Sequence, residues 1–373
     1  MELKKYKLAD IGKVITGKTP STSIAENYAW GTIPFYTPED VAKGLGMMGR
    51  NSRFISKTGF EEIASNTISG ESVLVGCIGS DMGNVAYSNI TCATNQQINA
   101  ITQFKNGIDP LYVYYLLSTM KSYFQKIAGS TTTPILPKSV FEEIEIHLPD
   151  MKKQKDVVSI LYALDRKIEL NKRINDNLEE QLRLITSRYI FSCPNLEKKR
   201  IGEIATVKAG GDCPITFSKT RTQKCNIPIF SNGTEDRGLY GFTNKANIEG
   251  HSITVAARGT IGYCERRLMP FVPIIRLLAI TPKEDGAYIY LHQVIRGMKF
   301  KKNGSVQQQL TVPEISFIEI PYPHSSILYE YNKVASPIVE MIERNISENE
   351  ILTKQRDELL PLLMNGQASV NSD

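Results

Sequence analysis

Several residue patterns that would place this chain in a well-defined protein class are missing. The six cysteines never form Cys-x-x-Cys, and none of the four histidines lies near them at the spacing of metal ligands. No apolar run reaches the length of a membrane span, and the N-terminal residues lack the apolar stretch of a signal peptide. We therefore expect no metal site, no disulfide framework and no membrane segment, and we interpret the cysteines as small buried residues of a cytoplasmic protein.

The sequence also lacks the motifs of several enzyme classes. It contains no Asn-Pro-Pro-Tyr/Phe or Asp-Pro-Pro-Tyr of an amino-methyltransferase, no glycine-rich S-adenosylmethionine loop and no His-Glu-x-x-His. Pro149-Asp150 has no Glu-x-Lys partner on a neighbouring strand, which a nuclease centre of that type needs. We therefore predict a chain that has no catalytic residues of its own.

One enzyme motif is present, because Gly12–Thr19 matches the Gly-x-x-x-x-Gly-Lys-Thr pattern of a phosphate-binding loop. Such a loop needs a buried strand before it and a helix that starts at its Lys-Thr end. Here the preceding residues are polar, Pro20 follows directly, and the interior residues Val14–Thr16 are β-branched. We expect this stretch to bind no nucleotide; an ATP-dependent enzyme built on it is the alternative interpretation.

Glycine and proline are absent from the 40 residues Met151–Ile190, which predicts a helix about 60 Å long. Apolar residues recur in it every three or four positions, as in a helix that packs lengthwise on another helix. Two polar residues, Asn171 and Asn175, interrupt this seam. The apolar members of the seam are Val157, Leu161, Leu164, Ile168, Leu178, Leu182, Ile185 and Tyr189.

The same seam recurs 174 residues later in the chain. Both asparagines return as Asn345 and Asn349, and Arg356, which corresponds to Leu182, is the one break in character. Proline disfavours a helix interior, so Pro337 is expected to delay or kink the start of this second helix. We predict that the two helices pair as an antiparallel coiled coil in which the four asparagines fix the register, since a polar seam position lowers stability but specifies alignment.

The segments before the two helices also resemble each other. The corresponding stretches are Leu8–Gly17 and Ile201–Gly210, Ile33–Tyr36 and Ile227–Phe230, and Ile144–Pro149 and Ile318–Pro323. In the first segment we expect strands over Leu8–Ile11 and Val14–Ile15 and a helix over Pro110–Phe124. The pattern predicts an α+β fold with two similar globules, separated by the two long helices and related by a pseudo-two-fold axis. The predicted boundaries are 1–150 and 191–323 for the globules, 151–190 and 324–366 for the helices, and 367–373 for a tail.

Charge is distributed unevenly along the chain. Residues 191–323 contain 18 basic and 11 acidic residues, whereas residues 1–150 contain 13 and 14. A basic excess favours a polyanionic partner for the second globule, while the case for the first rests on local patches. A coiled-coil scaffold that binds no DNA is a further alternative, which the basic excess disfavours.

Short motifs occur in a particular order along the chain. They are Gly17-Lys18-Thr19-Pro20-Ser21, Trp30-Gly31, Ile33-Pro34-Phe35, Asn95-Gln96-Gln97, Gly129-Ser130-Thr131-Thr132-Thr133, and Leu148-Pro149 leading to Gln154. Together with the alternation of globule and helix, this order resembles the specificity (S) subunits of type I restriction-modification enzymes over nearly the whole chain. The sequence departs from that family at the helix entrances, where Asp150 follows Pro149 and Leu328 stands in the position of Gln154.

The resemblance implies a targeting subunit that is not itself an enzyme. Each globule would be a target-recognition domain that reads one half of a bipartite duplex DNA sequence. The paired helices would set the spacer and dock two methyltransferase (M) subunits, and a restriction/translocase (R) subunit would complete the nuclease. We expect no cofactor in this chain, since S-adenosylmethionine, ATP and magnesium would belong to the partner subunits.

DNA contacts require cations and hydroxyl groups for phosphates, and Arg, Asn or Gln for base edges. The loops of both globules contain such residues, although a polar loop residue is equally well explained as simply solvated. In the first globule the candidates are Lys18, Thr19, Ser21, Asn84, Gln96, Gln97, Thr131, Thr132, Thr133 and Lys138. In the second they are Asn232, Arg237, Tyr240, Arg258, Thr260, Lys302, Gln307, Gln308 and Gln309.

Overall fold

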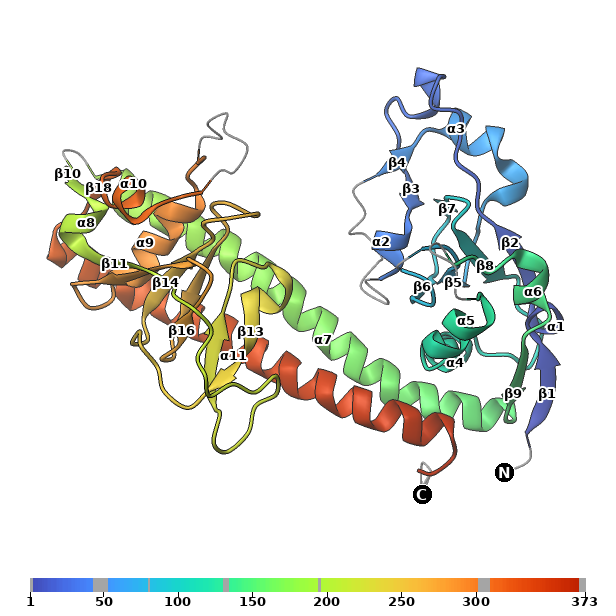
Figure 1. Ribbon diagram of the computed structural model, residues 1–373. Helices are drawn as coiled ribbons and strands as arrows, with labels where there is room; N and C mark the ends of the chain where they lie inside the picture. The colour runs from blue at the N-terminus through green and yellow to red at the C-terminus, as the bar shows by residue number, and fades with distance from the viewer. Residues whose placement is uncertain are drawn as a thin grey trace. The chain divides into compact units, whose positions relative to one another are not determined.

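The computed structural model describes residues 3–42, 53–79, 81–129, 134–193, 196–300 and 309–368. The chain is a mixed α/β protein that divides into two compact units. Unit 1 comprises residues 1–172 and 346–373, and unit 2 comprises residues 173–345. Each unit includes part of two long helices, α7 (Met151–Thr186) and α11 (Ser325–Met364), which are labelled in Figure 1.

The described residues of unit 1 form three small sheets (Figure 1). The four-stranded sheet has the order β2 (Lys13–Thr16), β8 (Ile98–Thr102), β5 (Ser72–Gly76) and β6 (Val85–Ser88). In the second sheet, β3 (Ile33–Tyr36) lies between β4 (Phe54–Ile55) and β7 (Ala93–Thr94), and in the third, β1 (Lys4–Lys7) pairs with β9 (Glu145–Leu148). The short helices are α1 (Leu8–Ile11), α2 (Pro38–Val41), α3 (Lys57–Glu62), α4 (Pro110–Ser118), α5 (Lys121–Ile127) and α6 (Lys138–Glu142).

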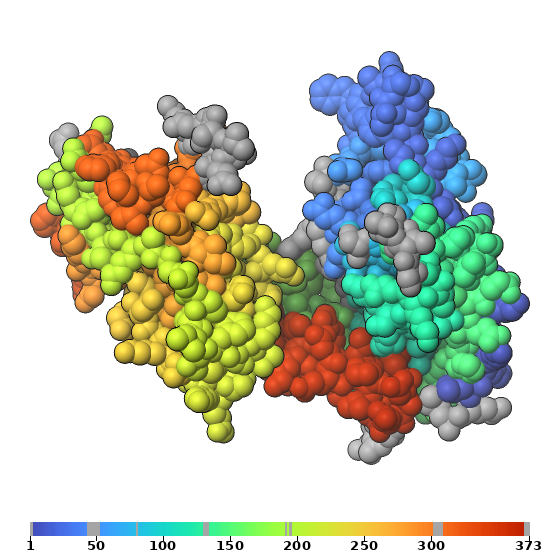
Figure 2. All heavy atoms as spheres, in the orientation of Figure 1, coloured from blue at the N-terminus to red at the C-terminus, as the bar shows by residue number. Residues whose placement is uncertain are grey.

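The core of unit 1 joins its sheet to the long helices. Helix α4 begins at Pro110 because the side chain of Asp109 accepts hydrogen bonds from the amides of Leu111 and Tyr112. Its buried face packs in one apolar cluster with β5, with Leu161 of α7 and with Leu363 of α11. Figure 2 shows this end of α11 in red, directly against the teal surface of α4 and α5.

Unit 2 repeats the sheet plan of unit 1 strand for strand. Its four-stranded sheet has the order β11 (Ala205–Ala209), β17 (Leu278–Pro282), β14 (Ser252–Val255) and β15 (Cys264–Arg267). The other strands form the sheet β13 (Leu239–Thr243), β12 (Ile227–Phe230) and β16 (Val272–Pro273), and the pair β10 (Glu197–Arg200) and β18 (Glu319–Tyr322). The short helices are α8 (Ile201–Ile204), α9 (Ala287–Arg296) and α10 (Val312–Ser316).

Three local predictions differ from the structure. Leu8–Ile11 is a helical turn and not a strand, because the Asp10 carboxylate accepts the amide hydrogen of Lys7 (2.9 Å) and caps it. The predicted helix over Pro110–Phe124 is two helices, α4 and α5, separated at Thr119 and Met120. Helix α11 begins at Ser325, so Pro337 does not delay its start.

In each unit, α7 and α11 run antiparallel and bring two of the predicted asparagines together. In unit 1, Asn171 Nδ2 donates to Asn349 Oδ1 (3.0 Å). In unit 2, Asn345 Nδ2 donates to Asn175 Oδ1 (2.8 Å). Each asparagine thus forms a hydrogen bond with the side chain of another asparagine, so these amide groups have polar partners in a mostly apolar helix contact. Their role in fixing the register stays a prediction.

The structure explains why Arg356 breaks the repeat of the seam. Arg356 Nη1 donates to Oδ1 of Asp165 (2.8 Å), and the hydroxyl of Tyr115 donates to Oδ2 of the same carboxylate (2.7 Å). The positions in unit 2 that correspond to Arg356 and Asp165 in the 174-residue repeat are apolar, namely Leu182 and Val339, and both are buried in its core. The two units therefore fill one structural position with different chemistry.

Four of the six cysteines are buried, as predicted, but Cys193 is half-buried and Cys213 is exposed. All six are free thiols. Within the described residues, every helix is either too short or too polar to cross a bilayer.

Candidate nucleic-acid interface

One edge of the four-stranded sheet in unit 1 gathers loops from distant parts of the chain. Because β2 and β5 both run antiparallel to β8, the residues after β2, after β5 and before β8 lie at the same edge. The amide of Gly17 donates to the carbonyl of Ile98 (3.0 Å), and the amide of Cys77 donates to that of Gln97 (2.8 Å). We call this surface, residues 17–19, 77–79, 95–97 and 134–136, the unit 1 edge.

The unit 1 edge holds four of the predicted contact residues. Lys18 is exposed, Thr19 Oγ1 donates to Gln96 Oε1 (2.9 Å), and Gln97 Oε1 accepts from Asn95 Nδ2 (2.9 Å). The chain approaches itself so closely here that a Cβ on Gly17 would lie 2.1 Å from the Thr94 hydroxyl oxygen, so only glycine fits. The edge thus presents a cation, a hydroxyl group and amides, the groups that contact phosphates and base edges.

The corresponding edge of unit 2 comprises residues 210–211, 256–263 and 274–277. Strands β11 and β14 both run antiparallel to β17, which brings these loops together. Asn232 ties them to one another, since its Nδ2 donates to the carbonyl of Ile275 (2.7 Å) and its Oδ1 accepts from the amide of Ala257 (2.8 Å). The hydroxyl of Thr260 donates to the Asn232 carbonyl (2.8 Å). We call this surface the unit 2 edge.

Two of the predicted residues on the unit 2 edge remain accessible to a ligand. Arg258 is exposed, and its Nη2 donates to Oε1 of Gln309 (2.7 Å), which lies beside the edge. Thr260 is exposed on the same loop. Asn232, by contrast, uses both ends of its amide to brace the loops, so its side chain has a structural role in place of the predicted contact.

Other predicted residues lie away from the sheet edges. The backbone amide of Ser21 donates to Glu62 (3.1 Å), Lys138 pairs with Glu142 (3.4 Å), and the ring of Tyr240 lies 5.7 Å from that of Phe217 at an angle of 46°. Asn84 follows the loop that leaves β5, and its Oδ1 accepts from Lys121 Nζ (2.7 Å). Thr131, Thr132, Thr133, Lys302, Gln307 and Gln308 lie outside the described residues.

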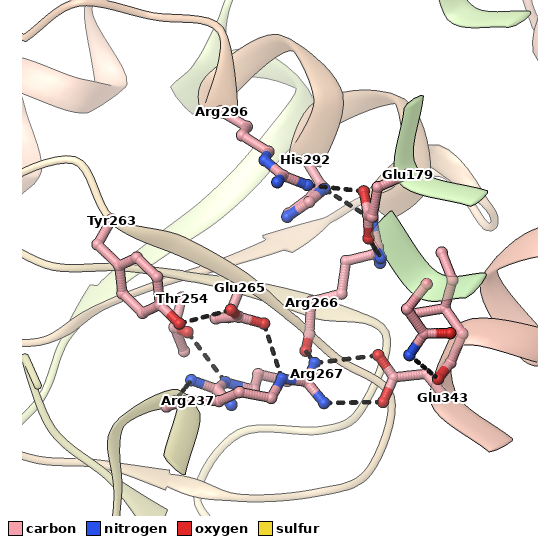
Figure 3. Close-up of polar contacts among 12 residues, drawn as sticks. Glu179, Arg237, Thr254, Tyr263, Glu265, Arg266, Arg267, His292, Arg296 and Glu343 are labelled. Atoms are coloured by element: carbon pink, nitrogen blue, oxygen red, sulfur yellow. Dashed lines mark hydrogen bonds and ion pairs between the residues drawn. The ribbon is translucent and has the colours of Figure 1, made fainter. Parts of the chain in front are cut away.

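Arg237 is fixed inside an ion-pair network and is not available for a DNA contact. Its two terminal nitrogens donate to both carboxylate oxygens of Glu343 on α11 (3.0 Å each), and its Nε donates to Glu265 (2.8 Å). Figure 3 shows the guanidinium held between these two carboxylates. Burial opposes its charge, but Glu265 and Glu343 raise the pKa of Arg237 above the ordinary value. Arg237 therefore anchors the turn between β12 and β13 to the long helix.

A second cluster, also in Figure 3, joins β15 and α9 to α7 within unit 2. Arg266 and Arg296 both bond to the carboxylate of Glu179, and Arg266 Nη1 lies 2.9 Å from Nδ1 of His292. Burial, together with the charges of Arg266 and Arg296, holds the pKa of His292 well below its ordinary value. His292 is therefore neutral at pH 7. The cluster has a structural role, because it fixes β15 and α9 to α7.

The Gly12–Thr19 stretch does not have the geometry of a phosphate-binding loop. Lys13–Thr16 forms strand β2, whose register runs along β8 from Thr102 to Asn99. Val14 and Ile15 are buried, and the chain after Thr19 continues as a loop up to the short 3₁₀ turn Ala25–Asn27. Its backbone amides are thus committed to a sheet and not arranged around an anion.

A family model described as "Type I restriction modification DNA specificity domain" matches the chain twice, over residues 1–180 and 195–360. The chain belongs to this family. The MjaIX type I restriction enzyme specificity subunit of Methanocaldococcus jannaschii is 26% identical over 98% of this chain and 93% of its own length. The HindI specificity subunit of Haemophilus influenzae is 33% identical over 45% of this chain and 38% of its own length.

A solved structure of a type I restriction-modification S subunit from M. genitalium shares the fold of this specificity-family chain. It aligns over 97% of this chain and 96% of its own, with a TM-score of 0.63 and 16% sequence identity. The two matches of the family model agree with the internal repeat of sheets and loops seen in the structure.

Two residues of the unit 2 edge were missed by the sequence reasoning. Ile275 and Arg276 form the turn between β16 and β17, and both side chains are exposed. Ile-Arg is not a typical turn pair, so composition gave no signal for them. The repeat does give one, because aligning β16 with β7 places Ile275 and Arg276 opposite Gln96 and Gln97.

Proposed function

We propose that this chain is the DNA-targeting subunit of a type I restriction-modification complex and that each unit reads one half of a bipartite target. The observation that carries the proposal is the repeated loop edge. Both units end their four-stranded sheet in loops rich in cationic, hydroxyl and amide side chains. The residue types differ between the two edges, which suits two half-sites of different sequence.

The contact residues that we propose are polar residues of the two edges, together with Gln309, which lies beside the unit 2 edge. Lys18 and Arg258 supply charge that neutralises phosphates, and charge neutralisation makes binding depend steeply on salt. Thr19, Gln96 and Gln97 in unit 1, and Thr260 and Gln309 in unit 2, supply donors and acceptors for phosphate oxygens and base edges. Arg237 and Asn232 are left out because their side chains are half-buried and bonded within unit 2, whereas Arg258 and Thr260 are exposed.

The long helices are proposed to give the target its fixed spacer. Paired as an antiparallel coiled coil about a pseudo-two-fold axis, they would separate the two half-sites and dock two methyltransferase subunits. Those subunits would methylate adenine with S-adenosylmethionine, and a restriction/translocase subunit with ATP and magnesium would complete the nuclease. The chain itself would be non-catalytic.

The proposal is tested by mapping methylated adenines with single-molecule sequencing. The host carries the neighbouring methyltransferase gene either with or without this chain. Methylation at one bipartite motif that disappears when the chain is deleted supports the proposal and yields both half-sites. Methylation that is unchanged without the chain contradicts it.

A further inference from the structure

The turn between β16 and β17 in unit 2 has a backbone conformation that its residues disfavour. The amide of Leu277 donates to the carbonyl of Ile274 (3.0 Å), which closes a turn with Ile275 and Arg276 at its centre. Both central residues have positive φ, 52° and 60°. Turns of this kind favour Asn-Gly, and a β-branched residue at positive φ is a rare outlier.

Neighbouring segments hold this turn in place from several sides. The amide of Ile275 donates to the carbonyl of Gly211 (2.9 Å), and the amide of Arg276 donates to that of Gly210 (3.0 Å). Asn232 Nδ2 donates to the carbonyl of Ile275 (2.7 Å). A strained conformation persists only where its surroundings determine it in this way, and such strain concentrates at functional sites.

The side chains presented by this rigid turn are free to meet a ligand. Ile275 is 50% exposed. Arg276 is exposed, and within the described residues its guanidinium has no hydrogen bond or ion pair. Through Asn232 the turn is joined to the loop that carries Arg258, and neither residues 256–263 nor residues 274–277 include an acid. The nearby segment 208–212 contributes one basic residue, Lys208, and one acidic residue, Asp212.

An arginine in a fixed position is suited to one base above the others. Its planar fork donates two parallel hydrogen bonds to O6 and N7 of guanine in the major groove. An aliphatic side chain beside it is suited to the methyl group of thymine. The equivalent turn of unit 1 carries Gln96 and Gln97, the residue type that pairs with adenine, so the two units present different reading chemistry at one position of the fold.

We propose that the turn Ile275–Arg276 is a base-reading element of unit 2, in which Arg276 selects a guanine in the half-site read by that unit and Ile275 packs against the adjacent base. This inference rests on the proposed function and assigns the base chemistry of one of its two edges. It predicts a G·C pair in one half-site and assigns its recognition to a single side chain.

The test is methylation mapping in cells, with the chain expressed together with its methyltransferase partner. We expect Arg276→Ala to relax one G·C position of one half-site and to leave the other half-site and the spacer unchanged. Discrimination at that position should fall about 5- to 160-fold, which corresponds to the 1–3 kcal/mol of a bidentate base contact. Arg276→Lys should relax the same position, because an ammonium group cannot form the fork.

Two further variants sharpen the test. Arg276→Gln gives unit 2 the residue type of unit 1 and should shift the preference at that position from guanine toward adenine. Arg221→Ala removes another exposed arginine of unit 2, one that lies outside the edge, and should leave the motif unchanged. Circular dichroism and co-purification with the methyltransferase verify that each variant is folded and assembled.

Separate outcomes distinguish this inference from the proposed function. A wild-type complex that methylates no bipartite motif contradicts the proposed function itself. A wild-type bipartite motif that Arg276→Ala leaves unchanged at every position overturns only the role of Arg276. A variant that methylates the same motif more slowly at all sites also overturns it, because a phosphate contact weakens binding without changing base preference.

Discussion

The bonds of Tyr115 and Arg356 to the buried carboxylate of Asp165 allow a quantitative test of how unit 1 is held together. Asp165 is 8% exposed and depends on Arg356 and Tyr115 for its hydrogen bonds. Arg356→Leu would leave that carboxylate without its cation. Breaking a buried ion pair costs about 3–5 kcal/mol, and because the Arg356 side chain is 28% exposed, we expect about 2–4 kcal/mol here after allowance for solvent screening.

The unit 2 positions suggest how the loss can be recovered. Leu182 and Val339 occupy the places there that Arg356 and Asp165 occupy in unit 1, and neither carries a charge. The triple variant Tyr115→Phe/Asp165→Val/Arg356→Leu removes the charges and the hydroxyl group together. Replacement of a buried ion pair by apolar residues is often neutral or stabilising, so we expect a stability within about 1 kcal/mol of the wild type.

Urea unfolding followed by circular dichroism at about 222 nm measures these changes in the free energy of unfolding. The exposed pair Lys167–Glu348 (3.6 Å), which also joins α7 to α11 in unit 1, is the matched control. Lys167→Ala should cost less than about 1 kcal/mol. If Arg356→Leu costs no more than Lys167→Ala, or if the triple variant is as unstable as Arg356→Leu, the reasoning is refuted.

Three further predictions concern unit 2 and the helices. Because the pKa of His292 is lowered by burial and by Arg266 and Arg296, the unfolded chain binds a proton that the folded chain does not. Stability is therefore complete above pH 6.5, the ordinary pKa of histidine, and is lost as the pH falls below it, by at most about 1.4 kcal/mol per pH unit. His292→Gln should make the melting temperature depend less on pH between about pH 7 and 5. A variant whose melting temperature falls with pH as steeply as that of the wild type would contradict this prediction. Arg237→Ala should destabilise unit 2 by about 3 kcal/mol and raise the rate of amide hydrogen exchange in β12 and β13, since it leaves Glu265 and Glu343 unpaired. Exchange rates that stay at the wild-type values would contradict the role of Arg237 in anchoring this turn to α11. Inserting seven residues into both α7 and α11 should lengthen the unread spacer by about three base pairs, since seven residues rise about 10 Å, and altered half-sites in the methylation map would exclude the spacer role.

The long helices and the repeated globular plan could be predicted from the sequence because both leave periodic signals. Apolar residues that recur about every 3.5 positions are typical of a helix that pairs with another helix. The recurrence of Asn171 and Asn175 as Asn345 and Asn349 marks the internal repeat. The break at Arg356 could not be interpreted in the same way. Its partner Asp165 lies 191 positions away, and no local pattern links the two.

Residue type suggested which loops could contact DNA, but it could not separate residues that are free to bind a ligand from residues that bond to other parts of the protein. Arg237 and Arg276 are both loop arginines, yet the first is enclosed by two carboxylates and the second is free within the described residues. That difference depends on tertiary neighbours such as Glu343. The positive φ of Ile275 is likewise imposed by hydrogen bonds from distant loops and contradicts the local preference of isoleucine.

The claim that each unit reads one half-site is tested most directly by a chain with two copies of the same globule. Residues 191–323 are replaced by a second copy of residues 1–150, both long helices are kept, and methylated adenines are mapped by single-molecule sequencing beside the wild type. Our account predicts a symmetric target, in which the half-site of unit 1 occurs twice, in opposite orientations, about an unread spacer. Persistence of the wild-type half-site assigned to unit 2 would contradict it.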